Sequence, residues 1–204
     1  MNMSSSRRAM MTVYSDPSCP FSHRTRIVLH EKNINANIVD IVDGQWPEDV
    51  AASNPYGTSP TLMDRDLVLF NSNIIIDYFD ERFPHPALMP VDPVARAKTR
   101  LMLHRIDKDW YSLWPALMDG KPVKARKRLQ EDLTILAPMF EESEFFMGNN
   151  FSLLDCSLAP LLWRLPQLGI KLPASAKAVE VYAQRIFARE SFQASLSDIE
   201  RSMR

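Results

Sequence analysis

The sequence predicts an α/β domain followed by an all-helical domain, and three observations support this fold class. Short β-prone runs alternate with helical spacing over the first eighty residues. The segment 84–93, "PHPALMPVDP", contains four prolines, and proline continues neither a helix nor a central strand. After it, every apolar pattern has helical spacing. We therefore expect domains at 9–83 and 94–204, joined by a linker at 84–93.

The first half of the α/β domain reads as strand, helix, strand. "AMMTVY" (9–14) and "ANIVDIV" (36–42) are short β-prone runs. Between them, residues 20–32 form a predicted helix, because Pro20 suits the first helical position and apolar residues follow it. A helical crossover between two strands implies that they pair in parallel. Residues 46–53 are at most a short helix.

The second half reads as strand, strand, helix. "TLMD" (61–64) and "LVLF" (67–70) are separated by two residues, which predicts a tight hairpin at an antiparallel edge. A helix at 71–83 follows, with Asn71 or Ser72 as its N-cap. The order is therefore β-α-β, then β-β-α.

The second domain contains five stretches with helical spacing: 94–118, 123–146, 152–165, 175–190 and 192–203. The sharpest local signal is "FSLLDC". Ser152 and Asp155 have the spacing of a capping box in its Asp form, with Phe151 in the staple position. The plain role of this motif is to nucleate and stabilise a helix.

Composition excludes several classes of function. The 204 residues have a net charge of −1, so no global field attracts nucleic acid or an anionic membrane. The basic, polar start "MNMSSSRRAM" lacks the apolar region of a secretory signal and reads as a frayed tail. Two cysteines do not make a disulfide framework, which favours a reducing compartment. We expect a cytoplasmic protein that does not enter a membrane.

Common catalytic and metal-binding motifs are absent from the sequence. The five glycines are not spaced for a dinucleotide-binding or phosphate-binding loop, and no G-x-S-x-G elbow occurs. The histidines and cysteines show no zinc-ligand spacing, so no metal site is expected. The basic run 121–132 lacks interleaved aromatic residues and reads as a solvated helix face. Any contact with DNA is therefore expected to be indirect, inside a larger complex.

Cys19 is the candidate nucleophile. It lies in "SDPSCPFSHR", just before a predicted helix whose N-terminal amides would lower the pKa of a thiol. Ser22 stands where a resolving cysteine would be, so a thiol reaction could follow only a monothiol route. The alternative interpretation is a small residue beside a pocket that is no longer used.

The order of elements, the proline-rich linker and the Ser-x-x-Asp box together resemble the glutathione transferase superfold. Within it, "NPYGTSPTLMDRDL", "YFDERFPHPALMPVDPVARAKTRLMLHRIDKDWY" and "SLLDCSLAPLLWRLPQLGI" resemble the stringent starvation protein A family. The resemblance covers the chain from about Thr12 to Arg204. It implies a thioredoxin-like N-terminal domain and an all-helical C-terminal domain. It also implies a cis peptide bond at Ser59-Pro60.

The family resemblance implies a function other than catalysis. Members are homodimers that associate with RNA polymerase and its sigma factor and regulate transcription in starvation, stationary phase and acid stress. They generally lack transferase activity. The resemblance assigns partner binding to Pro84, His85 and Pro86, in the predicted linker. Prolines fix the backbone in advance, which lowers the entropic cost of docking a partner.

The resemblance also implies an incomplete glutathione site, which has lost part of its binding chemistry. Its residues would be Cys19, Phe21, Ser59, Pro60, Asn71 and Ser72. Glutathione-binding members have an acidic residue where this chain has Asn71, and the amide loses charge pairing with the ligand ammonium. We therefore expect no catalytic residue, no cofactor and at most weak glutathione binding. The alternative is a monothiol, omega-like glutathione S-transferase or dehydroascorbate-type reductase with Cys19 as its catalytic residue.

Overall fold

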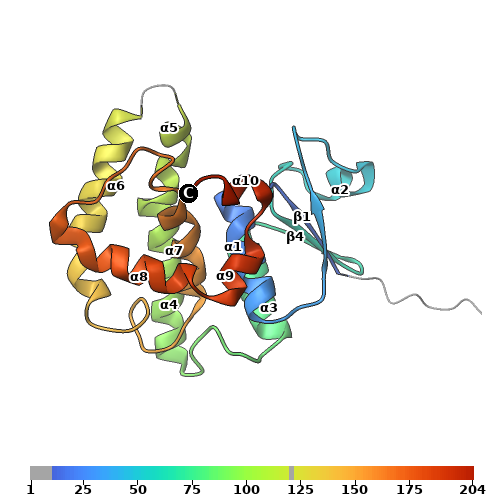
Figure 1. Ribbon diagram of the computed structural model, residues 1–204. Coiled ribbons are helices and arrows are strands. Elements are labelled where there is room, and N and C mark those ends of the chain that lie inside the picture. Colours follow the sequence, from blue (N-terminus) through green and yellow to red (C-terminus); the bar gives the residue numbers. More distant parts are fainter. Residues whose placement is uncertain (1–10, 120–121) are drawn as a thin grey trace, which may run out of the picture.

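The computed structural model describes residues 11–119 and 122–204, so the expected tail at 1–10 lies outside the described residues. A four-stranded mixed sheet lies at one side of the molecule (Figure 1). Its strands are β1 (Thr12–Ser15), β2 (Asn37–Asp40), β3 (Thr61–Asp64) and β4 (Leu67–Phe70). Their order in the sheet is β2-β1-β3-β4.

The strand pairing follows from the connections between the strands. β1 and β2 are joined through a helix and pair in parallel, with Val13 opposite Ile38. β3 runs antiparallel to β1, with Leu62 opposite Val13, and forms a hairpin with β4. The predicted parallel pair and the predicted edge hairpin are both confirmed.

Three helices accompany the sheet: α1 (Pro20–Glu31), α2 (Glu48–Ser53) and α3 (Ser72–Arg82). Pro20 is the first residue of α1, as its missing N–H allows. Asn71 is the N-cap of α3, and its side-chain oxygen accepts a 3.0 Å hydrogen bond from the Asn73 N–H. α1 and α3 pack against each other, and α1 also packs against two helices of the second part of the chain (Figure 1).

Among its described residues, the named elements of the second part are all helices. Its α-helices are α4 (Pro93–Asp109), α5 (Trp114–Met118), α6 (Val123–Ile135), α7 (Leu153–Arg164), α8 (Lys177–Phe187), α9 (Glu190–Ser195) and α10 (Asp198–Arg201). Short 3₁₀ turns occur at Tyr111–Leu113, Ala137–Phe140 and Ala174–Ala176. Every residue of α7 is buried, which makes this helix the centre of the helical part. α7 and α9 are the helices that pack against α1.

Three predicted helices are shorter than expected, and two prolines account for two of the corrections. The predicted helix 94–118 breaks after Asp109, so that Pro115 falls in the first turn of α5 rather than inside a longer helix. The predicted helix 123–146 ends at Ile135, and Pro138 follows in a 3₁₀ turn. The predicted helix 192–203 is two helices, because Ser197 caps a new one.

The capping box at the start of α7 is confirmed. Ser152 N–H donates to the Asp155 carboxylate at 2.8 Å, and the Ser152 hydroxyl accepts from the Leu154 N–H at 3.2 Å. The buried carboxylate also accepts from the Phe146 N–H at 2.9 Å and from the Tyr182 hydroxyl at 2.6 Å. Burial raises the pKa of Asp155 above its usual value. The motif therefore joins α7 to α8 and to the preceding loop, as well as starting a helix.

Candidate functional site

The linker residues Pro84, His85 and Pro86 form an exposed loop. Lys32, which follows the last residue of α1, binds the backbone of this loop. The Lys32 ammonium donates to the carbonyl oxygens of Phe83 and Pro86, each at 2.6 Å, and pairs with the Asp80 carboxylate at 2.7 Å. All three donors of the ammonium are thus used.

Asp80 extends this attachment along the linker. Its side chain accepts a 2.9 Å hydrogen bond from the Leu88 N–H, and both Lys32 and Asp80 are buried. The His85 ring makes no hydrogen bond to any described residue and faces solvent. The backbone is therefore fixed on both sides of His85 while both ring nitrogens stay available to a partner.

A hollow of about 730 Å³ adjoins this loop. Its walls come from residues 86–91 of the linker and from residues 146–152, before α7. Pro86 belongs both to the exposed loop and to the wall of the hollow. The loop and the hollow therefore form one continuous surface.

Cys19 is the half-buried N-cap residue of α1, and its surroundings do not lower the pKa of its thiol. Burial raises the pKa of the Cys19 thiol above its usual value and outweighs the nearby N–H groups of Phe21 and Ser22, which act in the opposite direction. The expectation of a lowered thiol pKa was wrong. The sequence identified the helix N-terminus and could not indicate how deeply the thiol is buried there.

The C-terminal segment covers the loop that leads to Cys19. The Ser197 hydroxyl donates to the Pro17 carbonyl at 2.6 Å, and Arg164 donates to the Ser18 carbonyl at 3.0 Å. Arg164 also pairs with Glu200 of α10, which in turn pairs with Arg26 of α1 at 2.5 Å. Glu200 and Arg164 are fully buried, so this loop is fastened to the helical part by charged groups without access to solvent.

The expected glutathione site is brought together in part. Phe21, Ser59, Asn71 and Ser72 line one hollow of about 450 Å³ between the two parts of the chain. Cys19 and Pro60 are not among its lining residues. The Ser59-Pro60 peptide bond is cis, as the resemblance implied.

A charged pair beside this hollow was missed by the sequence analysis, and of its two members Asp107 lines the hollow. Arg24 of α1 is fully buried and pairs with Asp107 of α4 at 2.7 Å. Its guanidinium also donates to Asn73 and, at 3.4 Å, to the Ser72 hydroxyl, and it lies 4.5 Å from the centre of the Tyr111 ring. Arg24 and Asp107 are 83 positions apart, so no local pattern links them.

These contacts leave little for a ligand to pair with. The Asn71 side-chain oxygen is used to cap α3, and the Asp107 carboxylate is shared between Arg24 and the Asn73 amide, which donates at 2.6 Å. The charged groups at the hollow are therefore already paired with one another. Among the described residues, no cluster of three or more metal-binding side chains is present. No helix in the described part of the chain is long and apolar enough to cross a membrane.

The basic run lies on α6, where Lys127 pairs with Glu131 at 3.7 Å and Arg128 with Asp132 at 2.9 Å. Lys121, at its start, lies outside the described residues. The pairing of these exposed charges fits the interpretation as a solvated helix face.

Comparisons with known proteins place the chain in a family. The glutathione S-transferase N-terminal domain model matches residues 13–87, and the C-terminal domain model matches residues 101–190. A stringent starvation protein A homolog from Coxiella burnetii is 47% identical over 202 residues, covering 97% of both chains. One from Pasteurella multocida is 48% identical and covers 96% of this chain and 94% of the relative.

Similarity also extends to the transferases themselves. Human glutathione S-transferase omega-2 is 30% identical over 168 residues, covering 79% of this chain and 69% of the relative. The crystal structure of glutathione transferase Omega 3C from Trametes versicolor is 27% identical, with a TM-score of 0.80 over 92% of this chain and 84% of that one. The chain therefore has the glutathione transferase fold, with a thioredoxin-like part and a helical part, and belongs to the stringent starvation protein A family.

Proposed function

We propose that this chain is a transcription regulator without transferase activity. It binds RNA polymerase and its sigma factor, acts in starvation, stationary phase and acid stress, and works as a homodimer in the cytoplasm with the polymerase. Its contact with DNA is indirect, through the polymerase. Relatives that are 45–48% identical are named for stringent starvation, which supports the physiological setting.

The observation that carries this proposal is the attachment of the exposed loop Pro84-His85-Pro86. Lys32 donates to the carbonyls of Phe83 and Pro86, so the loop does not need to be ordered when a partner arrives. The unpaired His85 ring can donate and accept hydrogen bonds at the partner surface. The adjoining hollow supplies an apolar wall beside it.

The absence of transferase activity is supported by the chemistry around Cys19. A thiol with a raised pKa contributes little thiolate at neutral pH, and the thiolate is the reactive form. Asp107, the charged residue that lines the hollow at the expected glutathione site, is already paired with the buried Arg24. Both features oppose a glutathione-dependent reaction.

The decisive experiment measures binding of the full chain to purified polymerase holoenzyme by biolayer interferometry. The Pro84→Ala, His85→Ala double variant should lose most of its affinity while it keeps its circular dichroism spectrum. His104→Ala, which also removes an exposed histidine, is the matched control and should bind like wild type. Equal binding by all three proteins, or no binding by wild type, would refute the proposed surface.

The second candidate is a monothiol glutathione S-transferase or dehydroascorbate-type reductase that uses Cys19. The similarity to omega-2 transferases favours it. Calorimetric titration with glutathione tests it directly, because this candidate requires saturable binding that the Cys19→Ser variant retains while losing activity. A titration without heat of binding would eliminate this candidate and leave the first one untouched.

A further inference from the structure

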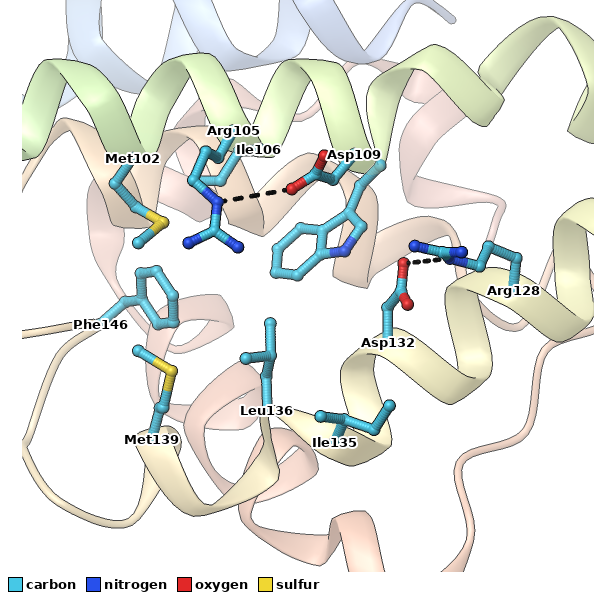
Figure 2. Close-up of a pocket in the computed structure, with 11 residues that line it drawn as sticks. Met102, Arg105, Ile106, Asp109, Arg128, Asp132, Ile135, Leu136, Met139 and Phe146 are labelled. Atoms are coloured by element: carbon cyan, nitrogen blue, oxygen red, sulfur yellow. Dashed lines mark hydrogen bonds and ion pairs between the residues drawn. The ribbon is translucent and has the colours of Figure 1, made fainter.

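A separate pocket lies between α4 and α6, in the helical part of the chain. It has a volume of about 260 Å³. Figure 2 shows Met102, Met139 and Phe146 gathered at one end and the Arg128–Asp132 pair at the other. Neither the residues of the expected glutathione site nor Pro84, His85 and Pro86 line it, and Phe146 is the residue that it shares with the hollow beside the linker loop.

The apolar lining sets the size and shape of a suitable ligand. The apolar residues that line the pocket are Met102, Ile106, Trp110, Ile135, Leu136, Met139 and Phe146. Pockets for drug-sized molecules measure roughly 300–1,000 Å³, so this pocket, at about 260 Å³, is smaller than those. Methionine side chains adapt to flat aromatic surfaces. The volume suits a molecule of about two fused rings, and the methionine side chains suit a planar one.

Trp110 supplies an unused hydrogen-bond donor. The residue lines the pocket and is only 4% exposed, and its indole N–H makes no hydrogen bond to any described residue. The buried, unpartnered side-chain polar atoms of the described chain are all arginine Nε atoms, so the indole nitrogen still has access to solvent. Trp110 lines the pocket, which is where a ligand would meet this donor. A buried donor of this kind gains from a ligand acceptor.

The charged residues at the rim are balanced. Arg105 pairs with Asp109 at 3.6 Å, and Arg128 pairs with Asp132 at 2.9 Å, in each case four residues along the same helix. These four are the charged residues that line the pocket. The rim therefore attracts neither an anion nor a cation preferentially, which favours a neutral ligand.

We propose that this pocket binds a small, neutral, planar aromatic molecule with one hydrogen-bond acceptor, which the Trp110 indole N–H recognises. The apolar walls enclose the rings, and the indole selects for the acceptor. This site contains neither the loop Pro84-His85-Pro86 nor any residue of the expected glutathione site.

A matched pair of probes tests the proposal. Quinoline and naphthalene have the same fused-ring shape, and quinoline alone carries a ring-nitrogen acceptor. Each is titrated into the full chain carrying ¹⁵N-labelled tryptophan, and the indole N–H resonances are followed at pH 7.5, with Trp110 assigned from the Trp110→Phe variant. Quinoline should shift the Trp110 resonance saturably and bind about two- to tenfold more tightly than naphthalene. The Trp46 and Trp163 resonances should remain in place.

Two variants separate the contributions. Trp110→Phe keeps an aromatic ring and loses both the donor and the reporter resonance, so its affinities are measured by calorimetric titration, and quinoline should lose its advantage over naphthalene. Leu136→Phe narrows the pocket and should abolish the shift, whereas Ile199→Phe, on α10, should leave it intact. An immobile Trp110 resonance in wild type, equal affinities for the two probes, or unchanged binding by Leu136→Phe would each overturn the proposal.

Discussion

Replacing Lys32 by Met tests the link between a buried charge and the exposed linker loop. Lys32 is 5% exposed and Asp80 is 4% exposed, so both charges are removed from water. Methionine preserves most of the aliphatic length but removes all three hydrogen bonds to Phe83, Pro86 and Asp80. The Asp80 carboxylate keeps its bond from the Leu88 N–H and loses its counter-charge.

The expected loss is large for a single substitution. Removing one partner of a buried ion pair typically destabilises a protein by about 3–5 kcal/mol, because the remaining charge is buried without compensation. The two carbonyl oxygens of the loop also lose their donor. We expect Lys32→Met to lower the free energy of unfolding by about 3–5 kcal/mol.

Urea unfolding followed by circular dichroism measures this loss. Lys98→Met is the control, because Lys98 is exposed and makes no ion pair with any described residue, and it should change stability by less than about 0.5 kcal/mol. Adding Asp80→Leu to Lys32→Met removes the stranded carboxylate and should recover part of the loss. A loss below about 1 kcal/mol for Lys32→Met, or strictly additive losses in the double variant, would refute the reasoning.

Three further predictions concern the buried titratable groups and the start of α7. Because burial raises the Cys19 thiol pKa, its alkylation by iodoacetamide at pH 7.5 should be slower than that of free cysteine and still accelerate at pH 9; a plateau below pH 7 would contradict this. Burial lowers the pKa of His23 well below its usual value. As the pH drops below about 6.5, the imidazole therefore gains a proton in the unfolded chain before it does so in the folded chain, and the free energy of unfolding falls. His23→Gln should reduce that dependence by up to about 1.4 kcal/mol per pH unit in urea titrations, and an unchanged dependence would reject the assignment. Ser152→Ala should lower stability by about 0.5–2 kcal/mol. Asp155→Ala should lower it further, because it also strands the Tyr182 hydroxyl, and equal losses in thermal unfolding would disprove that link.

The local elements could be predicted from the sequence because their signals lie within a few residues. The hairpin strands 61–64 and 67–70 have the predicted limits, since two turn residues separate two short apolar runs. Asn71 caps α3, and Ser152 and Asp155 start α7, because each cap forms through atoms of the same turn. Helix lengths were less predictable, since helical spacing continued past the breaks near Pro115 and Pro138.

The environment of the site residues depended on contacts between distant segments. Cys19 lies at a helix N-terminus, as predicted, but the packing around it determines the direction of its pKa shift. Arg24 finds Asp107 only when α1 and α4 are brought together. Both outcomes depend on how deeply a charge is removed from water, which a linear pattern does not encode.

The sequence by itself determined the order of helices and strands along the first domain, β-α-β then β-β-α, the proline-rich linker and the start of α7. Steric limits and helix caps act within one turn of the chain, so local sequence is enough to predict them. The tertiary structure alone decided that Lys32 holds the loop around His85 and that Asp107, at the expected glutathione site, pairs with the buried Arg24. The physical reason is burial. A charged side chain that is buried against an oppositely charged residue from a distant segment stabilises the fold. One without such a partner stays available to bind a ligand.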